Sequence, residues 1–119
     1  MPAPERKIRN KVMAWLKAQK ATTPIWWFAV IGGGVQTPGV PDLCLVVDGR
    51  SVWFEFKSLT GQLTDKQRHV KTQIESAGGA VFVIRSVDDA VRAFEVIEQA
   101  EFWEKKVRGT SNGSLAKQR

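Results

Sequence analysis

The sequence of 119 residues contains almost none of the side chains that form disulfide frameworks or zinc sites. Its single cysteine, Cys44, excludes an internal disulfide and is typical of a reducing cytoplasm. With only one histidine beside it, the chain also lacks the ligands of a zinc site built from cysteine and histidine. We therefore expect a cytoplasmic protein. Any bound metal would need oxygen ligands, which favours magnesium or manganese.

Long apolar runs are also missing. No stretch approaches the roughly 20 residues of a membrane-spanning helix, and the opening segment MPAPERKIRNK has no signal-peptide core. The run Gly32-Gly33-Gly34 lacks the Gly-Lys-Ser/Thr ending of a phosphate-binding loop. We therefore expect neither a membrane nor a nucleotide cofactor as a partner.

Positive charge is concentrated at the two ends of the chain, whose formal net charge is +6. Residues 105–119 hold five Lys/Arg and no acid, which leaves +1 for residues 1–104. We expect residues 1–104 to fold as one domain and the basic tail 105–119 to be disordered. One interpretation of this charge is nucleic-acid binding, and the other is a solvated helix face with a solubilising tail. The candidate DNA-binding residues are Arg6, Lys7, Arg9, Lys11, Lys66 and Arg68.

Apolar periodicity and turn signals predict a single α/β domain. Helices are predicted over residues 4–20, from the cap Thr64 to the stop signal Gly78-Gly79, and over residues 86–106 with Ser86 as cap. Strands are predicted over residues 25–31, 42–47, 51–57 and 80–85, with a loop over 32–41 and a hairpin turn at Asp48-Gly49. The order αβββαβα predicts a mixed central sheet flanked by helices.

The predicted hairpin of residues 42–57 carries three charged residues that point to a site, because a buried charge is costly unless it is paired or bound. If residues 48–49 form a type I′ turn, counting outward places Asp42 opposite Glu55. Opposed side chains lie on one face with Cβ atoms about 5 Å apart, close enough to share a cation. Lys57 points to the same face. The other face is wholly apolar: Leu43, Leu45, Val47, Val52, Phe54 and Phe56.

Glu5 adds a third carboxylate from the first predicted helix. At about 100° per residue, it falls among Ile8, Val12 and Leu16 on the apolar face of that helix. One interpretation is a first-turn glutamate favoured by the helix dipole. The other is a group directed at the same site as the hairpin carboxylates, and the presence of the hairpin favours it.

In this order, these residues resemble the core motif of the PD-(D/E)xK nuclease superfamily. Pro41-Asp42 is followed by Glu55-Phe56-Lys57 on the next strand. The sequence is further similar to the virus-type replication-repair nuclease (VRR-NUC) family, in its stand-alone phage or bacterial type. That pattern has an early helical Glu, G-x-PD, an ExK strand and a Gln on the next helix. The matching residues, within a resemblance that covers about residues 5–94, are Glu5, Gly39-Val40-Pro41-Asp42, Glu55-Phe56-Lys57 and Gln67.

The resemblance implies a restriction-endonuclease-like fold and a Mg²⁺- or Mn²⁺-dependent nuclease, similar to Holliday-junction resolvases. It implies Asp42, Glu55 and the Phe56 carbonyl as metal ligands, with Glu5 as a further candidate. Lys57 would contact the attacking water or the phosphate. The expected catalytic set is Glu5, Asp42, Glu55, Lys57 and Gln67. The resemblance also implies a homodimer and a role in recombination or DNA repair, in the host cytoplasm if the chain is encoded by a phage.

Two groups of residues have competing interpretations. Gln67 completes a capping box with Thr64, yet it shares a helix face that could point toward the site. Trp26, Trp27 and Phe28 cannot all face inward on one strand, so one tryptophan should emerge on the second face. A helix would cover that tryptophan, or a partner subunit would.

We therefore expect a structure-specific DNA endonuclease that hydrolyses phosphodiester bonds in branched DNA. The alternatives are a less selective endonuclease or nickase that acts on ordinary double-stranded DNA, and a module that binds junctions without cutting them. A scaffold whose acids merely stabilise the fold is a further alternative.

Overall fold

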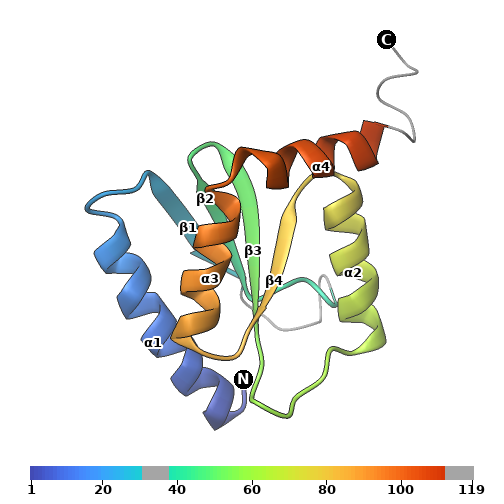
Figure 1. The fold of residues 1–119 in the computed structure, drawn as a ribbon. Coiled ribbons are helices and arrows are strands. Elements are labelled where there is room, and N and C mark those ends of the chain that lie inside the picture. The colour runs from blue at the N-terminus through green and yellow to red at the C-terminus, as the bar shows by residue number, and fades with distance from the viewer. Residues whose placement is uncertain (31–37, 112–119) are drawn as a thin grey trace.

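A computed structural model of the chain describes residues 1–30 and 38–111, with side chains as far as Lys105. The predicted end of the first strand at Ile31, most of the predicted loop 32–41 and the end of the predicted tail lie outside the described residues. The elements are α1 (Ala3–Gln19), β1 (Ile25–Ala29), β2 (Leu43–Val47), β3 (Arg50–Phe56), α2 (Asp65–Ser76), β4 (Ala80–Ile84), α3 (Val87–Ile97) and α4 (Ala100–Ser111). The predicted α/β class, with a mixed sheet flanked by helices, is confirmed (Figure 1).

The register of the sheet follows from the turn between β2 and β3. Asp48 and Gly49 both have positive φ, 49° and 80°, as a type I′ turn requires. Val47 therefore pairs with Arg50, and Leu43 with Phe54. The strand order is β1-β2-β3-β4, in which the first three strands are antiparallel and β4 runs parallel to β3.

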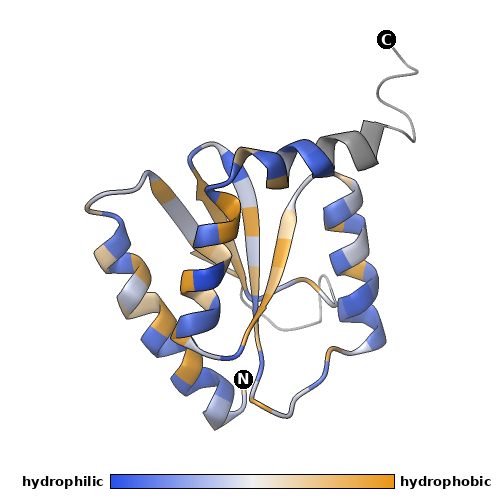
Figure 2. Cartoon of the chain, viewed as in Figure 1, coloured by the Kyte–Doolittle hydropathy of each residue, from blue (hydrophilic) through white to orange (hydrophobic). Residues whose placement is uncertain are grey.

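The core lies between one face of the sheet and the helices α1 and α3. The six apolar hairpin residues predicted for this face are all buried. Phe54 lies at its centre, with edge-to-face contacts to Phe82 and Phe94 at 6.4 Å between ring centroids. The strands are mostly apolar, whereas the helices alternate between apolar and polar residues (Figure 2). The second face of the sheet is thus left for other residues, among them Glu55.

The helix predicted over residues 86–106 is two helices, so that part of the prediction is wrong. α3 ends at Ile97, and α4 begins at Ala100 and crosses the hairpin end of the sheet (Figure 1). The turn brings Trp103 back onto the core, where it is buried and its Nε1–H donates to the Ile97 carbonyl at 2.8 Å. Arg50 stacks on the same indole, 5.1 Å from the ring centroid. A straight helix would carry Trp103 away from these contacts.

The disorder predicted for residues 105–119 is also corrected in part. α4 continues to Ser111, so the beginning of that segment is helical. Lys105, Lys106 and Arg108 have good helix propensity, and they extend a helix that Trp103 has already anchored. Among the helices of the described part, none is long and apolar enough to cross a membrane.

We expect Trp103→Ala to destabilise the fold by about 3–5 kcal/mol, because it removes a buried aromatic ring and a hydrogen bond to the end of α3. Urea unfolding followed by circular dichroism measures the change. Leu59→Ala is the control, since Leu59 is 81% exposed, and it should shift stability by no more than about 0.5 kcal/mol. Equal stability of the Trp103 variant and the wild type would show that α4 does not dock through this residue.

Candidate active site

Asp42 and Glu55 meet on the second face of the sheet, where β2 begins and β3 ends. Extending the observed register one pair beyond Leu43 and Phe54 sets them opposite each other. Asp42 is fixed on both sides: its carbonyl accepts from the Val30 N–H at 2.9 Å, and its Oδ2 accepts from the Phe56 N–H at 2.8 Å. The predicted pairing of the two carboxyl groups is therefore the arrangement that the hairpin forms.

Burial and the neighbouring carboxylate perturb Glu55 strongly. Its side chain is 4% exposed. Desolvation, followed by the hydrogen bond and charge of Asp42, raises the pKa of Glu55 to about 9. When both carboxyls are ionised neither can donate, and Glu55 Oε1 then has no hydrogen-bond partner in the described part of the chain. The pair therefore favours a bound proton or a cation.

Lys57 and Glu5 both act electrostatically on Glu55. The charge of Lys57 lowers the pKa of Glu55, whereas that of Glu5 raises it, so both residues lie within electrostatic range. Glu5 is half-buried in the first turn of α1, which starts at the end of the sheet where β3 finishes (Figure 1). The helix layer and the strand layer thus contribute charges to one place.

Gln67 both completes the capping box and faces the site, so its two predicted positions are compatible. Its backbone N–H donates to Thr64 Oγ1 at 3.1 Å, and its Oε1 accepts from the Thr64 N–H at 2.9 Å, which completes the capping box. Its Nε2 donates to Glu55 Oε2 at 3.4 Å. The space between α2 and the sheet beside this contact is too narrow for a water molecule. Gln67 therefore closes one flank of Glu55.

The donor set fits a hard divalent cation, although the side chains alone do not complete a metal site. Within the described residues, no three side chains of His, Cys, Asp or Glu come together as metal ligands. The buried Oε1 of Glu55 and the adjoining Asp42 carboxyl supply oxygen ligands of the kind that Mg²⁺ and Mn²⁺ prefer. The ligand roles of Glu5 and of the Phe56 carbonyl stay predictions. The contact that the structure gives Phe56 here is through its N–H.

The loop before Asp42 packs against the first turn of α2 because Gly39 has no side chain. Its φ is +87°, and a Cβ at this position would lie 2.6 Å from the Lys66 carbonyl oxygen. Only glycine accommodates both the backbone angle and this approach. The G-x-PD segment is therefore held between the sheet and α2.

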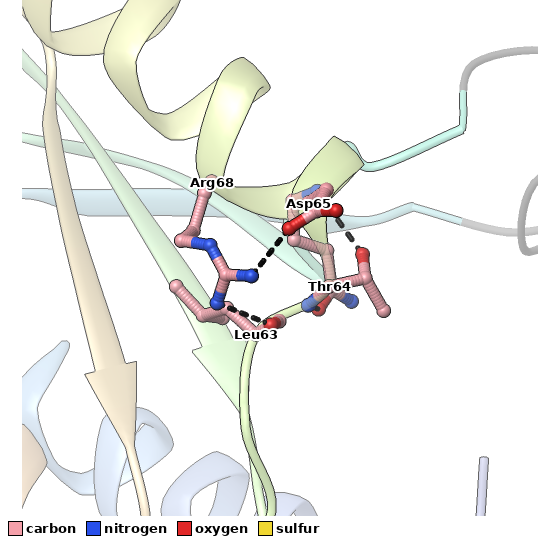
Figure 3. A network of polar contacts seen from close by, with 5 residues as sticks. Leu63, Thr64, Asp65 and Arg68 are labelled. Atoms are coloured by element: carbon pink, nitrogen blue, oxygen red, sulfur yellow. Dashed lines mark hydrogen bonds and ion pairs between the residues drawn. The ribbon is translucent and has the colours of Figure 1, made fainter.

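The predicted DNA-binding residues lie on two helices, α1 and α2, which cover opposite faces of the sheet. Arg6, Lys7 and Lys11 are exposed on α1 and Arg9 is half-buried there, while Lys66 and Arg68 are exposed on α2. The beginnings of α1 and α2 lie at the same end of the sheet (Figure 1). Arg68 is already engaged, because it donates to the Leu63 carbonyl at 2.7 Å and pairs with Asp65 at 2.5 Å (Figure 3).

Sequence reasoning missed Arg85, which donates to two backbone carbonyls of the segment between β3 and α2. A lone arginine after a buried strand is the one signal that the sequence gives.

Comparison of the chain with family models, curated proteins and solved structures found no match.

We expect the free energy of unfolding, without divalent cations, to fall as pH rises from about 4.5 to about 9. In this range the folded state binds more protons than the unfolded state, because the pKa of Glu55 is raised on folding. The contribution is at most about 1.4 kcal/mol per pH unit. Urea unfolding at several pH values measures it. Glu55→Gln should remove this slope, whereas the exposed control Glu95→Gln should retain it. An identical pH dependence in wild type and Glu55→Gln would contradict the assignment.

Proposed function

We propose that the chain is a metal-dependent DNA endonuclease with a PD-(D/E)xK fold of the VRR-NUC type. The observation that carries the proposal is the buried Glu55, set against Asp42, with Lys57 directly after the end of the same strand. A scaffold function has no need of a buried glutamate beside a second carboxyl, because its ionised form destabilises a fold unless a ligand neutralises it. The mixed sheet, with α1 and α3 on one face and α2 against the other, also agrees with this proposal.

Each residue has a role that its position supports. Asp42 and Glu55 would hold Mg²⁺ or Mn²⁺, with the Phe56 carbonyl and Glu5 as further ligands. When bound, such a metal supplies Lewis acidity and lowers the pKa of a coordinated water. Lys57 places positive charge where negative charge grows on the phosphate. Gln67 orients Glu55 through its amide N–H.

The proposed substrate is branched DNA, with the basic residues at the beginnings of α1 and α2 contacting the backbone on either side of the site. Phosphate contacts of this kind position a duplex without reading its sequence. Selectivity for a four-way junction over a linear duplex would then come from the spacing of two active sites in a dimer.

An exposed apolar patch supports the proposed homodimer. Trp26 and Phe28 on β1 are 58% and 45% exposed, with ring centroids 5.7 Å apart, and the opposed Val46 is 40% exposed. This is the tryptophan expected on the second face, and it stays exposed in the described part of the chain. Apolar patches of this kind mark interaction sites.

We expect Lys57→Ala to reduce cleavage of a labelled four-way junction by about 10²-fold or more, because it removes a charge that acts on the transition state. Its junction Kd should stay within a few-fold of wild type, and Lys17→Ala, an exposed lysine at the far end of α1, should cut normally. Reactions with Mg²⁺, Mn²⁺ or EDTA, on junction and linear duplex, measure this.

The alternatives predict different results from the same reactions. Equal cleavage of both DNAs would retain the active site and replace the resolvase proposal by a less selective endonuclease. Binding without cleavage under either metal would favour the non-catalytic module. Full activity of Lys57→Ala would remove Lys57 from the mechanism.

We expect sedimentation equilibrium to give twice the chain mass of 13.3 kDa for the wild type. Trp26→Arg should sediment as a monomer, because a charge in an apolar interface opposes association. Leu59→Arg, a change of the same kind at another exposed apolar residue, should remain dimeric. A monomeric wild type would remove the dimer from the proposal.

A further inference from the structure

The segment 57–64 joins the two elements that carry the candidate catalytic side chains. β3 ends with Glu55 and Phe56, and Lys57 follows, while α2 begins after the cap Thr64. Within the segment, residues 58–61 form a closed turn. The Gly61 N–H donates to the Ser58 carbonyl at 3.2 Å and to its Oγ at 3.0 Å. The position of this turn determines what lies beside Lys57.

Arg85 holds this turn from the neighbouring strand end. It follows β4 directly, and its Nη1 donates to the carbonyl oxygens of Ser58, at 2.5 Å, and Gly61, at 2.7 Å. The ion pairs in the described part of the chain do not include Arg85, so its charge is directed at these two carbonyls. Charge-assisted bonds of this kind are roughly twice as strong as neutral ones.

The backbone of Arg85 is itself fixed by the start of α3. Its N–H donates to Asp89 Oδ2 at 2.9 Å, and the Asp89 N–H donates to Ser86 Oγ at 3.2 Å, so Asp89 is part of the N-terminal cap. The next hydrogen bond of the β3–β4 ladder runs from the Lys57 N–H to the Ile84 carbonyl at 3.1 Å. Arg85 therefore reaches the turn from a rigid base.

The turn lies beside the side chain of Lys57. A Cβ placed on Gly61 would be 3.6 Å from Lys57 Cδ, which is ordinary van der Waals contact, and 3.0 Å from Ser58 Oγ. The Gly61 backbone thus lies one carbon atom short of contact with the aliphatic stem of the lysine. Displacement of the turn would change the space that is open to this stem.

We propose that Arg85 is a positioning residue for Lys57, acting through the turn of residues 58–61. The inference rests on the proposed function, because it assigns Arg85 a part in the reaction that Lys57 would assist. A group displaced by about 1 Å can cost about 10²-fold in rate, so a residue that fixes the turn beside Lys57 acts on catalysis without touching substrate.

Three variants test the proposal in single-turnover cleavage at saturating junction DNA. Arg85→Met should lower the rate by about tenfold to 10²-fold with junction Kd within about twofold of wild type. Arg85→Lys retains the charge and the donors on a shorter reach, so its rate should lie between the two. Lys17→Met is the control: it removes an exposed positive charge at the far end of α1, away from residues 58–61 and from Asp89, and should cut normally.

Amide hydrogen exchange of Gly61 in the metal-free protein gives a readout that does not depend on activity. Arg85→Met should speed this exchange while the amides of β3 and β4 stay protected, and the control should not. The proposal is overturned if Arg85→Met cuts at the wild-type rate, if its loss lies wholly in junction Kd, or if Gly61 exchange is unchanged. A wild type that cuts no DNA overturns the proposed function instead, and the catalytic part of this inference with it.

Discussion

The juxtaposition of Glu55 and Asp42 is the constraint on which the rest of the site depends. A carboxyl group that is nearly inaccessible to water, beside a second carboxyl, cannot ionise at its ordinary pKa. The neighbouring groups respond to that constraint: the positive charge of Lys57 lowers the cost of ionisation, and the Gln67 amide gives Glu55 one donor. Glu55 Oε1 is left without a hydrogen-bond partner in the described part of the chain, and a divalent cation would satisfy it. The proposed chemistry depends on that cation.

That juxtaposition is set at a distance by the type I′ turn at the other end of the hairpin. Positive φ at Asp48 and Gly49 fixes the pairing of Val47 with Arg50, and strand geometry carries the register down to the carboxylates. A slip of one residue would turn Glu55 into the core and expose the buried phenylalanines of β3. The apolar face that packs on α1 and α3 therefore selects the same register as the site needs.

The sequence predicted this part of the molecule well because its determinants are local. The Asp48-Gly49 turn, the alternation along β3 and the cap at Thr64 each depend on residues only a few positions apart in the sequence. The division between α3 and α4 was not predictable in this way. Residues 86–106 contain no glycine or proline that would mark an end, and the break depends on Trp103 packing back onto Arg50 and Ile97.

Arg85 was missed for a related reason. Its partners, Ser58 and Gly61, lie 27 and 24 residues earlier in the chain, and they bind it through backbone carbonyls, which any residue type offers. No pattern of side chains in the segment 58–61 could therefore have indicated the contact. The arginine reaches the turn only because β3 and β4 are parallel and finish at the same end of the sheet.

Gln67 shows how a local motif can determine the chemistry of a distant group. Its amide offers one acceptor and one donor end, and the capping box uses the acceptor, because Oε1 receives the Thr64 N–H. The Nε2 end must then point away from the cap, which is where Glu55 lies. The helix cap thus selects which end of the amide reaches the site. Because that end is a donor, Gln67 favours the ionised carboxylate that a metal ligand requires.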